Sequence, residues 1–434
     1  MMSDVSSNSA AKRVCTWWWP AMFLSLLAIA YCIRAIVPSP YAKIRSPDYH
    51  NHYKPVAENI LAGHGLVMPN GSFFVRCPPG HSTFLAAIWF VADRVNVSRD
   101  SLTEFVITLM HVTTAVLLAW AASRFWGMKW GILFAILWTA YPLSILYIPN
   151  FGSDGVYTTV LIGAAACFWV FACGPKVRYL GLALAGALMG LAMLFRPAAL
   201  LMPFALAAFL LFCVAKPWRQ RLAGACVFLA VMFAVIMPWE IAMYRHIGKV
   251  IPLSSGGPAS MIDGLVRPKS SDENNISPPL PADVETFVAD LRQKKQAGEV
   301  NTTKQVVAWL AKQTVDHPVT VLKIFGYKLA RSWYGTDSRR NETSILLLHL
   351  PLLFLAIVGG VRAWRRGGSY RELVLFVLAL ILISWFMAVT VASLVRYMMP
   401  VMGLLFLLLP AAFGCNRTLG FATDDASGKA TGVG

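Results

Sequence analysis

The sequence predicts an all-α polytopic membrane protein with about ten transmembrane helices, or eleven if a short apolar stretch at 80–92 also crosses the bilayer. Charged residues make up only 14% of the 434 residues, well below the ~25% of a soluble domain. Long apolar runs recur along the chain. The basic residues behind the net charge of +17 fall in short clusters between these runs, as they do in membrane proteins. We therefore expect membrane lipids as neighbours and no nucleic-acid partner.

The first expected span follows Lys12 and Arg13, and it is longer than the core of a signal peptide. We interpret it as an uncleaved signal anchor with its amino terminus in the cytoplasm. Nine further apolar runs approach the roughly 20 residues that are needed to cross a bilayer. The ten expected spans are 17–37, 102–123, 130–149, 156–174, 179–195, 197–215, 222–243, 345–361, 372–392 and 398–414.

Basic clusters orient these spans, because cytoplasmic loops carry an excess of Lys and Arg. If 80–92 lies on the outer surface or is re-entrant, every basic cluster between the later spans faces the cytoplasm. If it crossed, the same clusters would face outward. The expected topology in the cell inner membrane therefore has both termini inside and the segments 38–101, 150–155 and 244–344 outside. The cytoplasmic clusters are Arg124 with Lys129, Lys176 with Arg178, Lys216 with Arg219 and Arg221, Arg362 with Arg365, Arg366 and Arg371, and Arg417.

Four parts follow from this topology. We expect a transmembrane catalytic module at 1–243, which includes the first outer loop, and an extracytoplasmic region at 244–344. The latter is rich in Pro, Ser, Lys and Asp and has two helical patterns, so we expect a small outer appendage. Transmembrane helices at 345–414 and a disordered cytoplasmic tail at 415–434 complete the chain. No internal repeat of the transporter kind is present.

Two acidic residues, Asp48 and Asp154, lie in tight turns just beyond the outer end of a span. An acid beside a bilayer is costly unless it is paired or used in function. In the segment 46–53, Asp48 could deprotonate an acceptor hydroxyl, while the rings of His50 and Tyr53 could orient a sugar. The alternative for each acid is a solvated loop carboxylate. Asp48 and Asp154, together with His50 and His52, could also bind a divalent cation, although their spacing matches no known metal signature and no cofactor is certain.

Arginines on the outer side form a second set of candidates. Arg76 precedes two prolines, Arg196-Pro197 joins two spans, and Arg396-Tyr397 opens the last span. Each arginine could be an interfacial residue that extends to lipid headgroups. If the three converge, their guanidinium groups would suit a phosphate at the membrane surface, because guanidinium binds phosphate oxygens bidentately.

The outer segments resemble those of a known family. Ser-Pro-Asp48-Tyr, Tyr53-Lys-Pro-Val-Ala-Glu-Asn-Ile-Leu-Ala-Gly-His-Gly65 and Cys-Pro-Pro-Gly80 are similar to the first outer loop of polyprenyl-phosphate-sugar glycosyltransferases. This family has the C-type glycosyltransferase fold and includes protein mannosyltransferases, of glycosyltransferase family 39, and aminoarabinose transferases. Four later blocks resemble the family in the same order: Tyr141-Pro with Ser153-Asp154, Gly190-Leu-Ala-Met-Leu-Phe-Arg196-Pro197, Met237-Pro-Trp239 with Gly248-Lys-Val-Ile-Pro-Leu-Ser-Ser255-Gly-Gly257, and Arg396-Tyr-Met-Met-Pro400.

The resemblance implies transfer of a sugar from an undecaprenyl-phosphate carrier to an acceptor, which is a lipid, a glycan or a protein. The family's catalytic base falls on Asp48 and its second acid on Asp154. Its lipid-phosphate site falls on Arg76, Arg196 and Arg396. Two departures favour a generic bacterial member. Tyr49 replaces the usual acid after Asp48, and Cys77 stands where aminoarabinose transferases have lysine. The chain also lacks the large lumenal domain of eukaryotic protein mannosyltransferases.

Two other classes of function compete with an enzyme. A polyprenyl-lipid flippase or a small-solute transporter would place charged groups at the bilayer midplane and would show inverted repeats. Here the spans hold few ionisable groups, and the polar residues gather in the outer turns. A non-catalytic scaffold protein would not need the cluster around Asp48. The pattern therefore favours a membrane glycosyltransferase with its active site on the outer face.

Overall fold

The computed structural model describes residues 4–36, 45–174, 177–266, 281–336, 339–391 and 393–415, with the side chains of 4–17 and 339–340 left out. The expected disordered tail lies almost entirely outside the described residues. Part of the first outer loop, 37–44, and part of the 244–344 region, 267–280, also lie outside them.

The described residues form helices and loops, with one isolated β-bridge between Val67 and Phe73. Among the described residues, six helices are long and apolar enough to cross a membrane, and four further apolar helices are shorter. These ten coincide with the ten expected spans, so the predicted all-α polytopic fold is confirmed. The long helices are α1 (Asp4–Ile36), α5 (Arg99–Trp126), α8 (Asp154–Cys173), α11 (Trp218–Ile247), α16 (Arg339–Arg366) and α17 (Gly368–Thr390).

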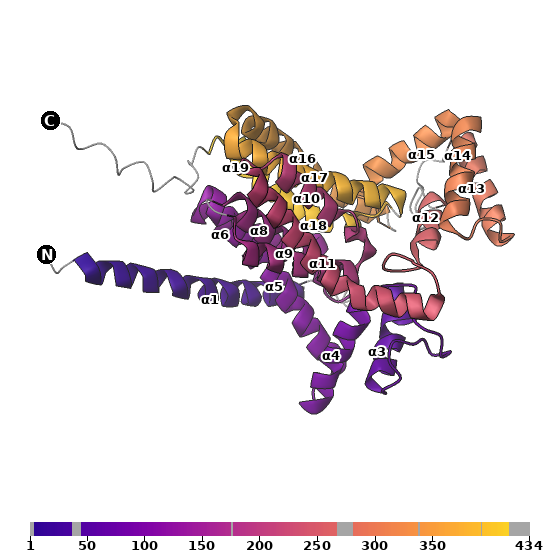
Figure 1. Ribbon diagram of the computed structural model, residues 1–434, viewed down its shortest axis with the longest axis horizontal. Coiled ribbons are helices and arrows are strands. Elements are labelled where there is room, and N and C mark those ends of the chain that lie inside the picture. The colour runs from indigo at the N-terminus through magenta and orange to yellow at the C-terminus, as the bar shows by residue number, and fades with distance from the viewer. Residues whose placement is uncertain are drawn as a thin grey trace.

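Helix α8 is the centre of the bundle, because 78% of its most apolar 18-residue stretch is buried inside the protein. It packs against α5, against α9 (Tyr179–Phe195) and against α18 (Met399–Leu405). The first helix is the opposite case. Only 11% of the corresponding stretch of α1 is buried, and Figure 1 shows α1 at the edge of the bundle. A helix this apolar and this exposed needs lipid around it.

Proline divides several expected spans into shorter helices. The expected span 130–149 becomes α6 (Met128–Thr139) and α7 (Pro142–Leu146). The span 197–215 becomes a 3-10 turn and α10 (Met202–Phe212), and 398–414 becomes α18, a 3-10 turn and α19 (Leu409–Ala412). Proline has no backbone N–H, so it starts helices readily but interrupts their interiors.

The apolar stretch 80–92 forms α4 (Gly80–Arg94), which belongs to neither group of candidate spans. Figure 1 shows α4 projecting from the bundle beside α3 (Lys54–Leu61). Its first residue allows a close approach to the end of α9, because a Cβ on Gly80 would lie 2.5 Å from the carbonyl oxygen of Leu194. The Pro-Pro-Gly80 motif thereby fixes the start of α4 against the bundle.

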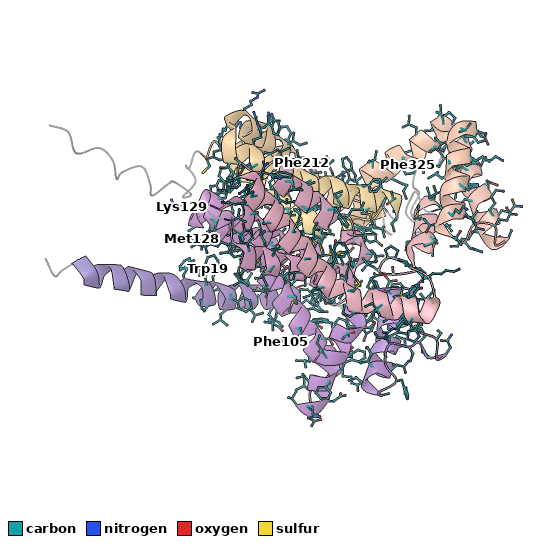
Figure 2. The ribbon with its side chains drawn as sticks, in the orientation of Figure 1. Trp19, Phe105, Met128, Lys129, Phe212 and Phe325 are labelled. Atoms are coloured by element: carbon teal, nitrogen blue, oxygen red, sulfur yellow. The ribbon has the colours of Figure 1, made fainter. Side chains whose placement is uncertain are left out.

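Between α11 and α16, the described residues form four helices, α12 to α15, which we call the appendage; they share a hydrophobic cluster built on residues such as Val284, Phe287 and Ile324. Figure 1 shows the appendage at one end of the molecule, where α12 and α15 contact α17. Figure 2 labels Phe325 on the appendage and Lys129 at the far end of the bundle. The helices are α12 (Gly257–Val266), α13 (Ala282–Gln296), α14 (Thr303–Asp316) and α15 (Pro318–Arg331).

Candidate active site

A cavity of about 350 Å³ lies where the bundle, the first loop and the appendage meet. One side, which we name the charged wall, consists of residues singled out from the sequence: Asp48, Tyr53, Arg76, Arg196 and Tyr397. They come from segments as far apart as residues 48 and 397, so the structure brings together what the sequence could only list. Two further candidates, Asp154 and Arg396, lie directly behind this wall, while His50 does not reach it.

The carboxylate of Asp48 lines the cavity and makes no hydrogen bond or ion pair to another described residue. Its backbone is held firmly. The amide of Ser46 donates to the carbonyl of Asn150 (2.9 Å), and the amide of Tyr49 donates to Oγ of Ser46 (3.0 Å). Asp48 then leads into a short π-helix, η1 (Tyr49–Tyr53). The arrangement gives a fixed but unengaged carboxylate, which is what a general base requires.

Two protonated groups flank this carboxylate. The hydroxyl of Tyr53 lies 3.3 Å from Oγ of Ser153, and burial raises the pKa of the Tyr53 phenol above its usual value. Burial also raises the pKa of the Cys77 thiol to about 11, with a further contribution from Asp48. Both groups are therefore neutral hydrogen-bond donors near pH 7. They can hold a substrate oxygen in place but are poor bases themselves.

Arg196 is fixed by an ion pair with Asp154. Helix α9 ends at Phe195, and Pro197 holds the preceding residue in extended backbone (φ −150°, ψ 132°). The guanidinium of Arg196 then donates to the carboxylate of Asp154 in the first turn of α8, and both side chains are buried. Asp154 does not line the cavity. Its position is therefore that of a partner to Arg196.

Arg396 and Tyr397 lie in a 3-10 turn, η3 (Val395–Tyr397), just before α18. The ring of Tyr397 contacts two cations, with the guanidinium carbon of Arg196 at 4.8 Å and that of Arg396 at 5.2 Å from its centroid. Burial raises the pKa of the Tyr397 phenol, but the two guanidinium groups outweigh it and the net shift is downward. Nε of Arg396 is buried and has no hydrogen-bond partner. The turn therefore holds a buried donor without a partner directly behind the charged wall.

Arg76 is exposed at the cavity and makes no hydrogen bond or ion pair to another described residue. Its loop is held by the segment before the appendage: the amide of Ser255 donates to the carbonyl of Val75 (2.8 Å). The ring of Phe73 stacks on His246, with centroids 3.9 Å apart. These contacts place the guanidinium of Arg76 on a loop that is held against the segment around Ser255.

The histidines of the first loop point elsewhere. His50 is exposed and packs edge-on against the ring of Tyr49 (5.2 Å), because Tyr49 and Tyr53 occupy the buried face of η1. The cavity lining does not include it, so its position does not support the predicted contact with substrate. His52 is also absent from the lining, and burial and then Arg76 lower its pKa.

The described residues offer no group of three or more His, Cys, Asp or Glu that could hold a metal ion. An oxygen of Asp154 is already engaged by Arg196. We derive no step that depends on a divalent cation.

Sequence reasoning missed two parts of the lining. The first part, which we name the appendage wall, comes from the appendage and the residue directly before it: Gly256, Gly257, Ser260, Met261 and Thr303. The apolar wall comes from the transmembrane helices: Ala198, Leu200, Met202, Met387 and Ala388. Neither wall carries a charge, so nothing marked these residues as a site. Only Gly256 and Gly257 lay in a segment that resembled the family.

The class of the fold is that of C-type glycosyltransferases. The chain is similar in structure to the oligosaccharyltransferase AglB of Archaeoglobus fulgidus, solved with an inhibitory peptide and a dolichol-phosphate, with a TM-score of 0.57 and 13% identity over 91% of this chain and 50% of that chain. The same enzyme solved with Zn and sulfate gives a TM-score of 0.53 at 13% identity, over 89% and 48%. The chain thus spans about half the length of that enzyme. At this identity the likeness shows the fold alone.

The family resemblance is confirmed by a more specific match. Residues 79–241, less than half of the chain, match the family of dolichyl-phosphate-mannose-protein mannosyltransferases. The chain is also similar to ArnT of Cupriavidus metallidurans bound to undecaprenyl phosphate, with a TM-score of 0.45 and 14% identity over 91% of this chain and 78% of that chain. No curated protein matches the chain.

Proposed function

We propose that the protein is a membrane glycosyltransferase. It moves one sugar from an undecaprenyl-phosphate carrier to an acceptor hydroxyl at the outer face of the cytoplasmic membrane. The observation that carries this proposal is the presence in one cavity of the free carboxylate of Asp48 and the guanidinium groups of Arg76 and Arg196. The match to a lipid-phosphate-sugar mannosyltransferase family supports the same reaction class.

The donor fits the cavity by charge and by polarity. The phosphate would lie against Arg76 and Arg196, which both line the cavity, since guanidinium groups bind phosphate oxygens through charge-assisted hydrogen bonds. Arg396 would add positive charge from behind the charged wall. The first isoprene units would lie along the apolar wall, which is continuous with α10 and α17. Ligand pockets commonly measure ~300–1,000 Å³. A cavity of about 350 Å³ is at the small end, which suits one sugar and its phosphate.

Asp48 would act as the general base. The acceptor oxygen attacks the anomeric carbon, its proton passes to the carboxylate, and the bond between the anomeric carbon and the phosphate oxygen breaks. The electron pair of that bond goes to the phosphate, whose charge the arginines stabilise. Attack from the side opposite the phosphate inverts the anomeric configuration. Since phosphate is a good leaving group, a base and correct positioning suffice.

Asp154 would not touch the reacting atoms. Its ion pair with Arg196 gives it a positioning role, in which it aims the guanidinium that binds the donor. We also propose that the module at 1–243 holds the chemistry, with the last helices supplying Tyr397, and that the appendage within 244–344 selects the acceptor.

One assay tests the reaction. Purified protein in nanodiscs is mixed with radiolabelled undecaprenyl-phosphate sugars, hexoses and pentoses, together with an extract of envelope lipids and glycans as acceptor. We expect free undecaprenyl phosphate to accumulate only when acceptor is present, with the label transferred to the acceptor. A flippase would move the intact lipid between leaflets of a proteoliposome without cleaving it, and a scaffold protein would do neither. Either result would overturn the proposal.

A further inference from the structure

Three helices meet at the edge of the cavity around a buried lysine. Lys328 lies on α15 and is 1% exposed. Its ammonium donates to the carbonyl of Gly264 on α12 and to the carbonyl of Val391 at the end of α17, both at 2.8 Å. Buried lysines are rare unless their donors are satisfied. This one joins the appendage to a transmembrane helix.

Both carbonyls belong to helix ends, which explains why a lysine is found there. Gly264 is in the last turn of α12, and Val391 directly follows α17. The last carbonyls of a helix have no partner within it, and they form the negative end of the helix dipole. Burial lowers the pKa of Lys328 to about 7, and Arg331 lowers it further in the same direction. An amine in either protonation state has enough N–H groups to donate to both carbonyls.

The backbones of α12 and of the end of α17 approach each other closely at this junction. A Cβ on Gly264 would lie 1.5 Å from the carbonyl oxygen of Val391 and 2.8 Å from Nζ of Lys328. Only glycine allows α12 to approach α17 this closely. Among the described residues, the neighbouring cation Arg331 is engaged by Glu342 (2.8 Å) and is therefore not available to replace the lysine.

The same two helices form part of the cavity. Helix α12 contributes Ser260 and Met261, about one turn before Gly264. Helix α17 contributes Met387 and Thr390, and Val391 itself lines the cavity. A change in the distance between Gly264 and Val391 therefore moves the appendage wall relative to the apolar wall.

We propose that Lys328 is a positioning residue that holds the appendage wall in place over the cavity. Without it, α12 separates from the end of α17 and the cavity opens to solvent. In its second part the proposal rests on the proposed function: the placed wall orients the acceptor for attack.

The first test needs no substrate. Cys77 lines the cavity and is a free thiol, so its alkylation by a small maleimide, followed by mass spectrometry of the Cys77 peptide, reports access to the cavity. In intact protein in nanodiscs, K328M should raise this rate by about tenfold or more, as expected when a local closure is lost. The matched control is K323M, which removes a lysine from the exposed side of α15, where it pairs with Asp283.

A second variant approaches the junction from the other helix. G264A should raise the rate at Cys77 in the same way, and it carries the test if K328M does not fold. Alkylation rates in K328M and G264A within about twofold of the rate in K323M would overturn the proposal that Lys328 holds the appendage wall in place. In the transfer assay, both variants should raise KM for the acceptor by about tenfold and leave KM for the donor unchanged. If alkylation of Cys77 becomes faster in the variants but no transfer is seen even in the unchanged protein, the positioning role of Lys328 stands and the proposed function fails.

Discussion

The charged wall and the appendage wall line the same cavity, but they are held in different ways. The charged wall is anchored in the bundle: Arg196 is fixed by Asp154 on the central helix α8, and Tyr397 lies between two guanidinium groups. The appendage wall has neutral, small or flexible side chains, such as Ser260 and Thr303. Its place depends on the small cluster within the appendage and on the junction of α12 with α17.

This difference indicates a division of labour. Groups that must stabilise charge work best when they are fixed before the reaction, because reorientation then costs nothing. Groups that select among acceptors need shape more than charge. The following three predictions test the division, and the largest effect is expected on the charged wall.

Replacement of Asp48 by Asn should remove the general base and lower kcat by about 10²–10⁴. Asn has the same shape, and the carboxylate has no partner to lose, so the melting temperature should stay unchanged. Transfer kinetics and thermal unfolding in detergent measure the two quantities. Glu58→Gln is the matched control, because Glu58 is an exposed acid of the same loop that pairs with Lys54. Turnover by Asp48→Asn at the level of this control would contradict the role of the base.

The ion pair behind the wall should matter to stability as well as to activity. Asp154→Asn leaves the buried guanidinium of Arg196 without a counter-charge, which costs about 3–5 kcal/mol when one partner of a buried pair is removed. The double variant Asp154→Asn with Arg196→Gln should recover most of the melting temperature but not the binding of the donor. Differential scanning fluorimetry and a lipid-binding assay measure these separately. An unchanged melting temperature in Asp154→Asn would show that the pair is not formed.

The smallest effect is expected on the appendage wall. Ser260→Val removes a hydroxyl and adds apolar bulk in the cavity lining, so KM for the acceptor should change about threefold to tenfold, as for a single poorly fitted group. KM for the donor and kcat should stay near their original values. Steady-state kinetics with each substrate varied in turn decides the matter. A change in KM for the donor alone would place the donor, and not the acceptor, against this wall.

The sequence predicted the fold well because the fold depends on properties that add up along the chain. Ten apolar runs became ten apolar helices, and 80–92 became α4, outside the candidate spans. The charged wall was also within reach. Asp48, Arg76 and Arg196 stand out in an apolar sequence, and charge is costly near a bilayer.

The rest of the site could not be predicted, for reasons that depend on packing. Asp154 and Arg196 were separate candidates in the sequence, and only the structure shows that the first neutralises the second. The outward position of His50 follows from the burial of Tyr49 and Tyr53 on a π-helix, whose periodicity the sequence does not reveal. Ser260 and Thr303 carry no charge, so nothing distinguishes them from many other hydroxyl groups.

The short helices of the bundle have a consequence for the depth of the site. With 17 residues at a rise of about 1.5 Å, α9 is roughly 25 Å long, which is less than the ~30 Å hydrocarbon thickness of a bilayer. A helix that starts at one edge of the hydrocarbon therefore ends a few ångströms below the other, and Arg196 follows immediately. A lipid phosphate could reach the arginine while its prenyl chain stays among the neighbouring acyl chains. In the proposed reaction, the breaks at Pro197 and before α18 would then let the donor reach the site without leaving the membrane.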